Sequence, residues 1–365
     1  MADQPLSSDL AALDTPALVV DLDVMDANIA QIMAACRARG VRWRPHIKGN
    51  KTPEIALRQI AAGAIGVTCA KLGEAEVMAD AGIGDILIAN QIVGPAKIAR
   101  LITLRERADP IVAIDSLAHV AALAGGHPDP AKPLRLVVEV DVGMKRAGVE
   151  PGEAAVRLAA AVARHRGLRF AGLMAWESQA VRIADPSEKE KVVKDALARL
   201  AATAALCREA GHEAAIVSCG GSGTFPFCIE QPGVTEVQIG GAIFSDMHYR
   251  GHYHLDFPPA LTLLATVTSR PTPTRIILDA GRKALPADIA MPSPLRLPPV
   301  NAIKFSAEHA TLELAAPSDT PRIGDRVEFI VGYSDMTVHL HEEIVAHRGG
   351  RIEAIWRVAA RGRLK

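Results

Sequence analysis

The chain lacks three features that mark common classes of protein: an excess of charge, a long apolar run and paired cysteines. Forty-one basic residues balance 41 acidic residues, so no overall field favours nucleic acid or an anionic membrane as a partner. No apolar run approaches the roughly 18 residues of a membrane span, and the N-terminal sequence has no basic and apolar leader. We therefore expect a cytoplasmic protein without a membrane or nucleic-acid partner, whose ligand is a small molecule.

The five cysteines are odd in number, and none lies in a Cys-x-x-Cys pair. This spacing argues against a disulfide framework and against a thiolate zinc site. We expect the cysteines to be buried as small apolar residues; they are Cys36, Cys69, Cys207, Cys219 and Cys228. With 365 residues, of which 49% are hydrophobic, the chain can bury a large core and is long enough for two domains.

Eight short strand-like runs, most of them separated by helix-compatible segments, follow one another through the first two thirds of the chain. They are Arg42–Ile47, Ile65–Cys69, Asp85–Ile88, Ile111–Ile114, Leu134–Val140, Leu168–Met174, Ala214–Ser218 and Thr235–Ile239. Strands that alternate with helices are typical of parallel β-α-β units, and eight of them predict a closed (β/α)8 TIM barrel. A doubly wound open sheet is the main alternative.

Beyond Phe257 the pattern changes to short runs rich in Val, Ile and Thr, interrupted by Pro and Gly, with no convincing helix between them. These runs predict a second, mostly antiparallel β domain. The last predicted strand is Thr337–Leu340. The Pro-rich stretch Leu285–Pro299 is predicted to be a long loop within this domain.

Lys48 lies where the first of the eight runs ends, in Arg42-Trp-Arg-Pro-His-Ile-Lys48. Thr52 and Pro53, a candidate N-cap and first helical residue, open the next segment. In an α/β protein, ligands and catalytic side chains gather at the carboxyl ends of the strands, so Lys48 is a candidate for chemistry. A solvated surface lysine is the alternative, and position alone favours it.

Glycines follow the seventh and eighth runs, in Cys219-Gly-Gly-Ser-Gly-Thr224 and at Gly240-Gly241. Consecutive glycines let backbone N–H groups form a concave anion site, the Ser and Thr hydroxyls add donors, and TIM barrels commonly bind phosphate in these two loops. A pair of flexible turns is the alternative. Arg146 after the fifth run and Trp176 after the sixth could reach the same mouth, although each is also typical of an ordinary loop.

A strand-end lysine, a phosphate site and an arginine together favour pyridoxal 5′-phosphate, which requires a lysine for an imine and donors for its phosphate. The sequence also resembles the D-threonine aldolase and D-serine dehydratase family of alanine-racemase-like (fold type III) pyridoxal-phosphate enzymes. The resemblance covers most of the chain. Its marks are Thr15-Pro-Ala-Leu-Val-Val-Asp-Leu-Asp23, Arg44-Pro-His-Ile-Lys48 with Lys51, Val138-Glu-Val-Asp-Val-Gly-Met-Lys-Arg-Ala-Gly148, Gly220-Gly-Ser-Gly-Thr224, Glu236-Val-Gln-Ile-Gly240 with Asp246 and Tyr249, and Trp356-Arg-Val-Ala-Ala-Arg-Gly362.

The resemblance implies a role for each matching residue. Lys48 would form the imine, Arg146 and His46 would line the cofactor ring, and Trp176, where a tyrosine is common, joins this catalytic set. The phosphate would be held by Gly221, Ser222, Gly223, Thr224, Gly240 and Gly241. The resemblance also implies a barrel domain of residues 22–257, a β domain of residues 1–21 with 258–365, and a homodimer in which the β domain of one chain faces the barrel mouth of the other.

One departure from the family concerns a divalent metal. Family members that hold a metal beside the cofactor usually bind it through a histidine followed two residues later by Cys or Asp, whereas this chain has Tyr333 and Asp335 at those positions. In a strand, Asp335, His339 and His341 would share one face and could bind Mn, Mg or Zn. Hydrogen-bonded polar residues are the alternative.

These observations favour a lyase that acts on a β-hydroxy D-amino acid. The expected reaction is retro-aldol cleavage of a D-threonine-like substrate to glycine and an aldehyde. Dehydration of D-serine or 3-hydroxy-D-aspartate is the first alternative, and an amino-acid racemase is the second. A non-catalytic pyridoxal-phosphate carrier barrel is disfavoured, because such proteins lack the second domain that residues 258–365 provide here.

Overall fold

The chain folds into two compact units, and the computed structural model describes residues 9–365. The barrel unit consists of Ala30–Lys48, Pro53–Gly240 and Gly362–Lys365. The β unit consists of the described residues up to Ile29 together with Gly49–Thr52 and Gly241–Arg361. The domain boundaries expected at residues 21 and 257 stay a prediction.

Eight parallel strands form the sheet of the barrel unit, in the order β2-β9-β8-β7-β6-β5-β4-β3. The strands are β2 (Arg42–Trp43), β3 (Val67–Cys69), β4 (Asp85–Gln91), β5 (Asp109–Ile114), β6 (Leu134–Glu139), β7 (Leu168–Met174), β8 (Ile216–Cys219) and β9 (Glu236–Val237). From β3 to β9, each strand pairs with its neighbours in sequence, and β2 pairs with β9. The predicted TIM barrel of eight parallel strands is confirmed.

Hydrogen bonds between the two end strands of this order close the sheet. The chain continues past β2 alongside β3, where the Ile65 N–H donates to the Trp43 carbonyl at 2.9 Å. The Thr68 N–H donates to the Pro45 carbonyl at 2.8 Å, and the Ile47 N–H donates to the Thr68 carbonyl at 2.9 Å. No edge strand is left exposed in the ring, so the alternative of an open doubly wound sheet is wrong.

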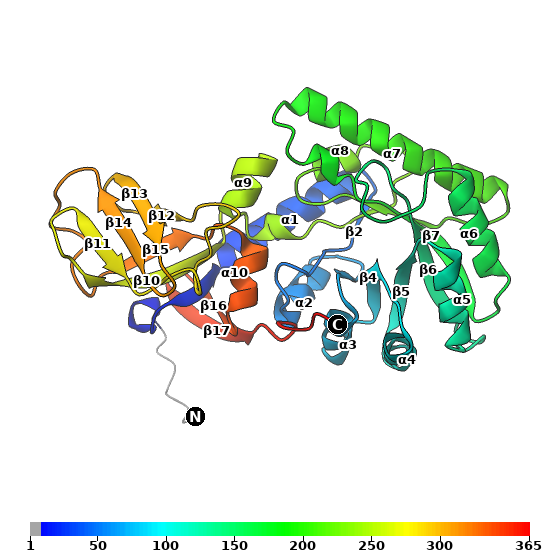
Figure 1. Cartoon of the computed structure of the whole chain (residues 1–365), viewed down its shortest axis with the longest axis horizontal. Helices are drawn as coiled ribbons and strands as arrows, with labels where there is room; N and C mark the ends of the chain where they lie inside the picture. Colours follow the sequence, from blue (N-terminus) through cyan, green and yellow to red (C-terminus); the bar gives the residue numbers. More distant parts are fainter. Residues whose placement is uncertain (1–8) are drawn as a thin grey trace. The chain divides into compact units, whose positions relative to one another are not determined.

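Helices connect successive strands and lie outside the ring (Figure 1). They are α2 (Pro53–Ala61), α3 (Leu72–Asp80), α4 (Pro95–Leu104), α5 (Leu117–Gly125), α6 (Glu153–Ala163), α7 (Pro186–Glu209) and α8 (Phe225–Cys228), with a 3-10 turn η2 (Ser178–Ala180). Local signals set their starts. Pro95 and Pro186 occupy first-turn positions, and the Asp185 carboxylate accepts from the Glu188 N–H at 2.8 Å. No helix among residues 9–365 is both long and apolar enough to cross a membrane.

A buried ion network ties the strands together where they begin. The Arg44 side chain is 2% exposed, and its Nε lies 2.9 Å from the Glu236 carboxylate of β9. Asp85 of β4 lies 3.1 Å from Arg44 and 2.8 Å from Arg135 of β6. Burial alone would raise the pKa of Asp85, but the two guanidinium groups hold it below its usual value. These charges are paired with one another at the amino end of the barrel, the end that supports stability in TIM barrels.

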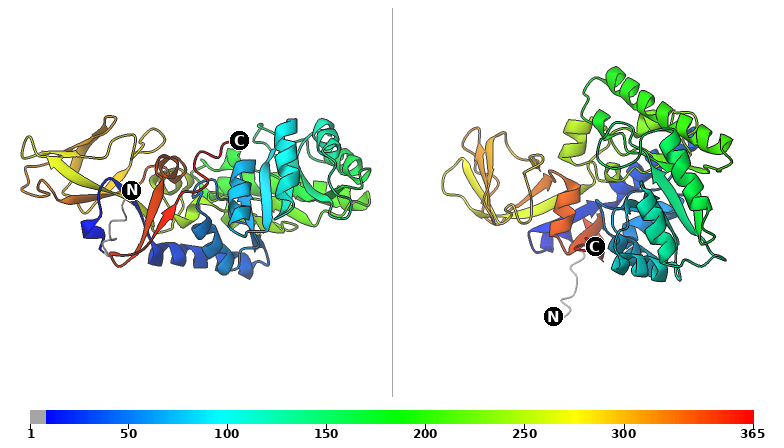
Figure 2. Two further views of the ribbon diagram at one scale, coloured as in Figure 1. Left: turned by 90° about the horizontal axis from the view of Figure 1, so that it is seen from below. Right: turned by 45° about the vertical axis from the view of Figure 1, so that its right-hand side comes forward.

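The β unit is built on a mostly antiparallel sheet in the order β13-β14-β11-β10-β1-β16-β17, with β15 pairing with β10 and β12. Figure 2 shows the strands of this unit in two further orientations. The strands are β1 (Ala17–Asp21), β10 (Leu261–Ser269), β11 (Arg275–Leu278), β12 (Ser293–Leu295), β13 (Val300–Phe305), β14 (Ala310–Leu314), β15 (Arg326–Ile330), β16 (Glu343–Arg348) and β17 (Arg351–Arg357). Strand β1 lies antiparallel to β10 and parallel to β16, so the N-terminal strand completes a sheet made otherwise from the last third of the chain.

The remaining helical elements begin or lie within the β unit. They are α1 (Leu22–Ala38), which starts in the β unit and ends in the barrel unit, α9 (Met247–Tyr253), α10 (Ser334–Leu340) and the 3-10 turns η1 (Leu10–Ala12) and η3 (Gly241–Ile243). Helix α10 overturns the predicted strand Thr337–Leu340. The Ser334 N–H donates to the Asp246 carboxylate at 2.6 Å, which caps the helix from outside, and Thr337 and Val338 are buried on one helical face. The β-branched residues misled the prediction because tertiary capping overrides local strand preference.

Candidate active site

Lys48 follows the first strand of the barrel at its carboxyl edge. The chain past β2 reaches His46, which forms a parallel bridge with Thr68 of β3, and two residues later comes Lys48 with an exposed side chain. The Lys48 backbone N–H donates to the Nδ1 of His46 at 3.4 Å. The predicted strand-end position of Lys48 and the neighbourhood of His46 are therefore present in the structure.

The loop after β8 is buried and glycine-rich. Gly220 has φ of +78°, which favours glycine, and the next four residues as far as Thr224 are all buried. A Cβ added to Gly221 would lie 2.4 Å from the indole ring of Trp176, so Gly221 and Trp176 are in contact. The Gly223 N–H donates to no atom of residues 9–365. A buried N–H without a partner is uncommon, and it marks this loop as a place where a ligand is bound.

The loop after β9 lies against the loop that carries Lys48. A Cβ at Gly240 would lie 2.4 Å from the His46 carbonyl oxygen, which leaves room for glycine alone. Within the barrel unit, the ends of β2 and β9 therefore meet at His46 and Gly240, and the ends of β7 and β8 meet at Trp176 and Gly221. These are four of the positions predicted from the sequence, and all of them lie on the carboxyl edge of the ring.

Arg146 belongs to a second polar cluster on the same edge. Its guanidinium is 58% exposed and lies 3.9 Å from the carboxylate of Glu139, the buried last residue of β6. The Gln91 amide of β4 donates to Glu139 at 2.6 Å, and Asp115 after β5 accepts from the Gly148 N–H at 3.0 Å. Burial raises the pKa of Glu139 against the opposing effects of Gln91 and Arg146.

Sequence reasoning found Arg146 but missed Glu139 and Gln91. Glu139 interrupts a run of apolar strand residues, Leu136-Val-Val-Glu139-Val. A carboxylate within such a run is a signal in its own right, because charged residues are almost never fully buried without a partner. Gln91 could not be recognised in this way, because a glutamine at the end of a strand is common. Only its hydrogen bond to Glu139 shows that it belongs to this cluster.

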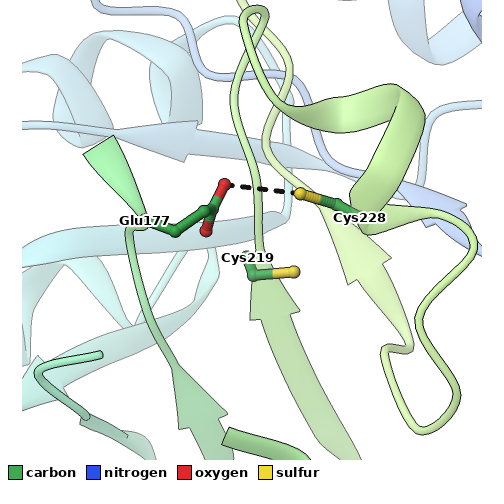
Figure 3. A group of neighbouring side chains, drawn as sticks. All are labelled: Glu177, Cys219 and Cys228. Carbon is green, nitrogen blue, oxygen red and sulfur yellow. Dashed lines mark hydrogen bonds between the residues drawn. The ribbon is translucent and has the colours of Figure 1, made fainter. Parts of the chain in front are cut away.

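Glu177 lies next to Trp176 on the carboxyl edge; the sequence indicated polar groups around Trp176 here but gave Glu177 no role of its own. It is 0% exposed. It accepts hydrogen bonds from the Thr224 hydroxyl at 2.5 Å, the Gly220 N–H at 3.3 Å and the Cys228 thiol at 3.3 Å. Figure 3 shows Glu177 pointing toward Cys228 from the neighbouring loop. Burial raises the pKa of Glu177.

In the β unit, all three tyrosines of the chain gather around two aspartates. The Tyr333 hydroxyl donates to the Asp335 carboxylate at 3.0 Å, and the Tyr249 hydroxyl donates to the other oxygen at 3.4 Å. The Tyr249 ring also lies where a Cβ at Gly241 would be, 2.2 Å away. Burial, followed by the Asp335 charge, raises the pKa of both tyrosines, so they act as hydroxyl donors.

Asp335 also lies close to Gly49, the residue that follows Lys48 in the sequence. An ideal Cβ at Gly49 would lie 2.5 Å from Asp335 Oδ1, so only glycine fits there without a shift of the carboxylate. The second aspartate, Asp246, caps both α9 and α10 through the Tyr249 and Ser334 N–H groups, and burial raises its pKa to about 7. Both aspartates are therefore built into the fold by several hydrogen bonds each.

The residues predicted to bind a metal are arranged differently from the prediction. The shared strand face does not exist, because Asp335 and His339 lie one turn apart on helix α10 and His341 lies just beyond its end. The Nε2 of His341 is 2.7 Å from the Ala284 carbonyl. Within residues 9–365, the one group of three metal-type ligands close enough to share an ion is Glu177, Cys219 and Cys228. Asp335 and His339 remain a two-residue candidate.

Comparison with known proteins agrees with this arrangement. The family model described as alanine racemase, N-terminal domain, matches residues 20–248, and a putative serine dehydratase domain matches residues 260–347. A D-threonine aldolase from Arthrobacter sp. is 35% identical over 97% of this chain and 94% of its own length. The chain belongs to the D-threonine aldolase and D-serine dehydratase-like family of alanine-racemase-type enzymes.

Solved structures of the same family match the whole fold. A D-threonine aldolase from Filomicrobium marinum superposes with a TM-score of 0.94 and 37% identity, covering 100% of both chains. The D-threo-3-hydroxyaspartate dehydratase from Delftia sp. HT23 superposes with a TM-score of 0.84 and 28% identity, covering 96% of this chain and 99% of that one. Both a lyase of the aldolase type and one of the dehydratase type are thus built on this fold.

Pyridoxal 5′-phosphate is the cofactor of this family, and the residues present fit it. The buried and unpaired Gly223 N–H offers a donor for a phosphate oxygen, and the crowding at Gly221 and Gly240 keeps both loops in close contact with their neighbours. Lys48 supplies the amine that the cofactor requires, at the end of a strand neighbouring the glycine loop after β9.

The contact of Gly221 with Trp176 predicts the effect of adding one methyl group. Gly221→Ala should lower the free energy of unfolding of the barrel by about 1–3 kcal/mol, because the new Cβ overpacks against the indole. The urea midpoint, followed by far-UV circular dichroism, measures this loss. The double variant with Trp176→Leu should recover most of it.

Gly84→Ala is the matched control, because a Cβ at Gly84 meets nothing within 4 Å and Gly84 does not have a positive φ. It should keep the wild-type midpoint. Equal midpoints for Gly221→Ala and Gly84→Ala would contradict the contact between Gly221 and Trp176.

Proposed function

We propose that this protein is a pyridoxal-phosphate-dependent lyase that cleaves a D-threonine-like β-hydroxy D-amino acid to glycine and an aldehyde. The observation that carries the proposal is the gathering of a lysine, two glycine loops and a buried unpaired N–H on the carboxyl edge of one barrel. Full-length likeness to D-threonine aldolases supports the reaction type.

The proposed cofactor site uses residues from several strand ends. Lys48 would attach the cofactor, Arg146 and His46 would line its ring, and Trp176 would pack beside its phosphate loop. The phosphate would be bound by Gly221, Ser222, Gly223, Thr224, Gly240 and Gly241. When bound, pyridoxal phosphate supplies an electron sink for the bonds at the Cα of an amino acid.

The chain itself would supply positioning and proton transfer. Retro-aldol cleavage requires that a base remove the proton of the substrate β-hydroxyl while the Cα–Cβ bond breaks. His46 is our first candidate for this base, since an imidazole can accept and return a proton near neutral pH. Arg146, exposed and 3.9 Å from Glu139, would orient the cofactor ring or the substrate carboxylate by a charged hydrogen bond.

Dehydration is the second candidate reaction, and the structural match to a D-threo-3-hydroxyaspartate dehydratase favours it. The two reactions differ in which bond at Cα breaks, so their products separate them. An aldolase releases glycine and an aldehyde, whereas a dehydratase releases an oxo acid and ammonia. A racemase would convert the D-amino acid to its L-enantiomer.

The deciding experiment incubates the holoenzyme with D-threonine, D-serine and D-3-hydroxyaspartate and identifies the products. We expect glycine and acetaldehyde from D-threonine. Lys48→Ala should reduce this activity by at least about a thousandfold, as loss of a covalent catalytic group does in other enzymes. Borohydride treatment of the wild type should leave the cofactor attached to Lys48. Attachment to Lys51 or Lys71, or an oxo acid as the main product, would contradict the assignment.

We further propose that the active form is a homodimer. An open barrel mouth exposes the reacting bond to water, and a second chain could cover it. Sedimentation at assay concentration should give about twice the chain mass of 38.6 kDa. A fully active species at the mass of one chain would overturn this proposal.

A divalent metal fits the chain only in part. Asp335 and His339 offer an oxygen and a nitrogen one helical turn apart, a set that suits Mn, Mg or Zn better than Ca. An ion bound there would supply Lewis acidity toward a substrate oxygen. The tyrosine hydroxyls on Asp335 compete for the same oxygens, so any binding would be weak.

Removal of metal tests this part of the proposal. We expect a chelator to lower activity reversibly and Mn to restore it. Asp335→Ala should lose this response yet keep the cofactor, which borohydride reduction and visible absorbance would record. Activity that is indifferent to exhaustive chelation would show that this branch of the family does without the metal.

A further inference from the structure

The carboxylate of Glu177 joins the two ends of the glycine loop after β8. Its Oε2 accepts from the N–H of Gly220, the first residue of the loop, at 3.3 Å. Its Oε1 accepts from the hydroxyl of Thr224, the last residue, at 2.5 Å. Glu177 itself comes from a different loop, the one that follows β7. One side chain thus fixes the loop from outside at both of its ends.

Thr224 continues these hydrogen bonds to Gly221, inside the loop. The Gly221 N–H donates to the Thr224 hydroxyl oxygen at 3.2 Å, and the Thr224 N–H donates to the Gly221 carbonyl at 3.1 Å. The loop is therefore folded back on itself, with Thr224 bonded both to Gly221 and to Glu177. The N–H of Gly223, between them, has no partner within residues 9–365.

Nothing about the stability of the barrel alone calls for a carboxylate at this position. Glu177 is fully buried, and no basic side chain of residues 9–365 pairs with it, whereas buried Glu236 is paired with Arg44. Burying such a group is costly unless all its hydrogen bonds are made. Glycines, in contrast, lose more conformational entropy on folding than any other residue, so a loop with three of them gains most from an external anchor.

We propose that Glu177 is a positioning residue that holds the Gly220–Thr224 loop in its phosphate-binding shape through hydrogen bonds to Gly220 and Thr224. This inference rests on the proposed function, because it assumes that the loop binds the cofactor phosphate. The hold depends on the reach of the side chain to both loop ends and not on its charge. Burial raises the pKa of Glu177, which is the direction that disfavours a second negative charge beside a phosphate dianion.

A metal site is the competing interpretation, because Glu177, Cys219 and Cys228 are close enough to share an ion. The contacts favour the hydrogen-bonded interpretation. The Cys228 thiol donates to Glu177 at 3.3 Å, and burial raises the pKa of this thiol well above its usual value, which keeps it protonated. A bound ion would require two thiolates and would break the hydrogen bonds that hold the loop.

Three substitutions of Glu177 distinguish the effect of side-chain length from the effect of negative charge. Glu177→Gln keeps the reach to both loop ends and removes the charge, since its oxygen can accept from Gly220 while its amide donates to the Thr224 hydroxyl. Glu177→Asp keeps the charge but withdraws both oxygens by one methylene. Glu177→Leu fills a similar volume without any acceptor. Glu236→Gln is the matched control, because it alters another buried carboxyl of the barrel at the opposite end of the strands.

The readout is the dissociation constant of pyridoxal phosphate, measured by ultrafiltration of each holoenzyme, together with the ³¹P resonance of the bound cofactor. Glu177→Leu should weaken binding by about 10- to 100-fold, the effect of leaving buried donors without a partner. Glu177→Asp should weaken it by about 5-fold or more, as for one lost hydrogen bond. Glu177→Gln should stay within about 3-fold of wild type, and Glu236→Gln should lower the thermal midpoint while binding the cofactor normally.

Each other outcome decides against the proposal. If Glu177→Leu binds the cofactor as tightly as wild type, or if it does not fold and Glu177→Asp binds normally, Glu177 has only a structural role. Weak binding by Glu177→Gln with normal binding by Glu177→Asp would show that charge, not reach, matters. Stoichiometric zinc that Asp335→Ala retains and Cys228→Ser loses would make Glu177, Cys219 and Cys228 metal ligands. If the wild type binds no pyridoxal phosphate at all, the proposed function itself fails.

Discussion

The pairing of the segment after β2 with β3 is the constraint on which the barrel unit depends. Hydrogen bonds from Ile47 to Thr68 and from Thr68 to Pro45 join the two ends of an eight-stranded sheet and close it. In a closed ring of parallel strands, every residue that follows a strand arrives at the same edge. Closure therefore brings residues from distant parts of the sequence to the carboxyl edge of the ring, among them Lys48, Arg146, Trp176 and the glycine loops.

The two ends of this ring carry different kinds of charge. At the amino end, Arg44 pairs with both Asp85 and Glu236. These opposite charges neutralise one another within the fold and stabilise the ring. At the carboxyl end, Glu139 and Glu177 are buried with mainly neutral donors, and burial raises the pKa of both. Groups whose ionisation is shifted in this way gather at functional sites more often than at structural ones, which agrees with chemistry at the carboxyl rim.

Alternation of strands and helices, and the positions of strand ends, were predictable because they follow from local patterns. Lys48 and Gly221 could be found in this way. Glu177 could not, because its importance lies in hydrogen bonds to a loop more than forty residues later. The error at Thr337–Leu340 has a similar origin. The segment has strand-forming residues, but a cap from Asp246, far away in sequence, makes it a helix.

The tyrosine cluster is the part of the β unit that most limits what Asp335 can do. Both carboxylate oxygens accept a hydroxyl from a tyrosine, and burial of Tyr249 and Tyr333 keeps these hydroxyls protonated. A cation that binds this carboxylate competes with two hydroxyl donors for its oxygens, so it gains less than by binding a carboxylate without such donors. Tyr333 stands where the family resemblance leads us to expect a histidine ligand, and it also provides one of the two donors. On this interpretation, one change of residue weakens a metal site twice, by removing a nitrogen and by occupying an oxygen.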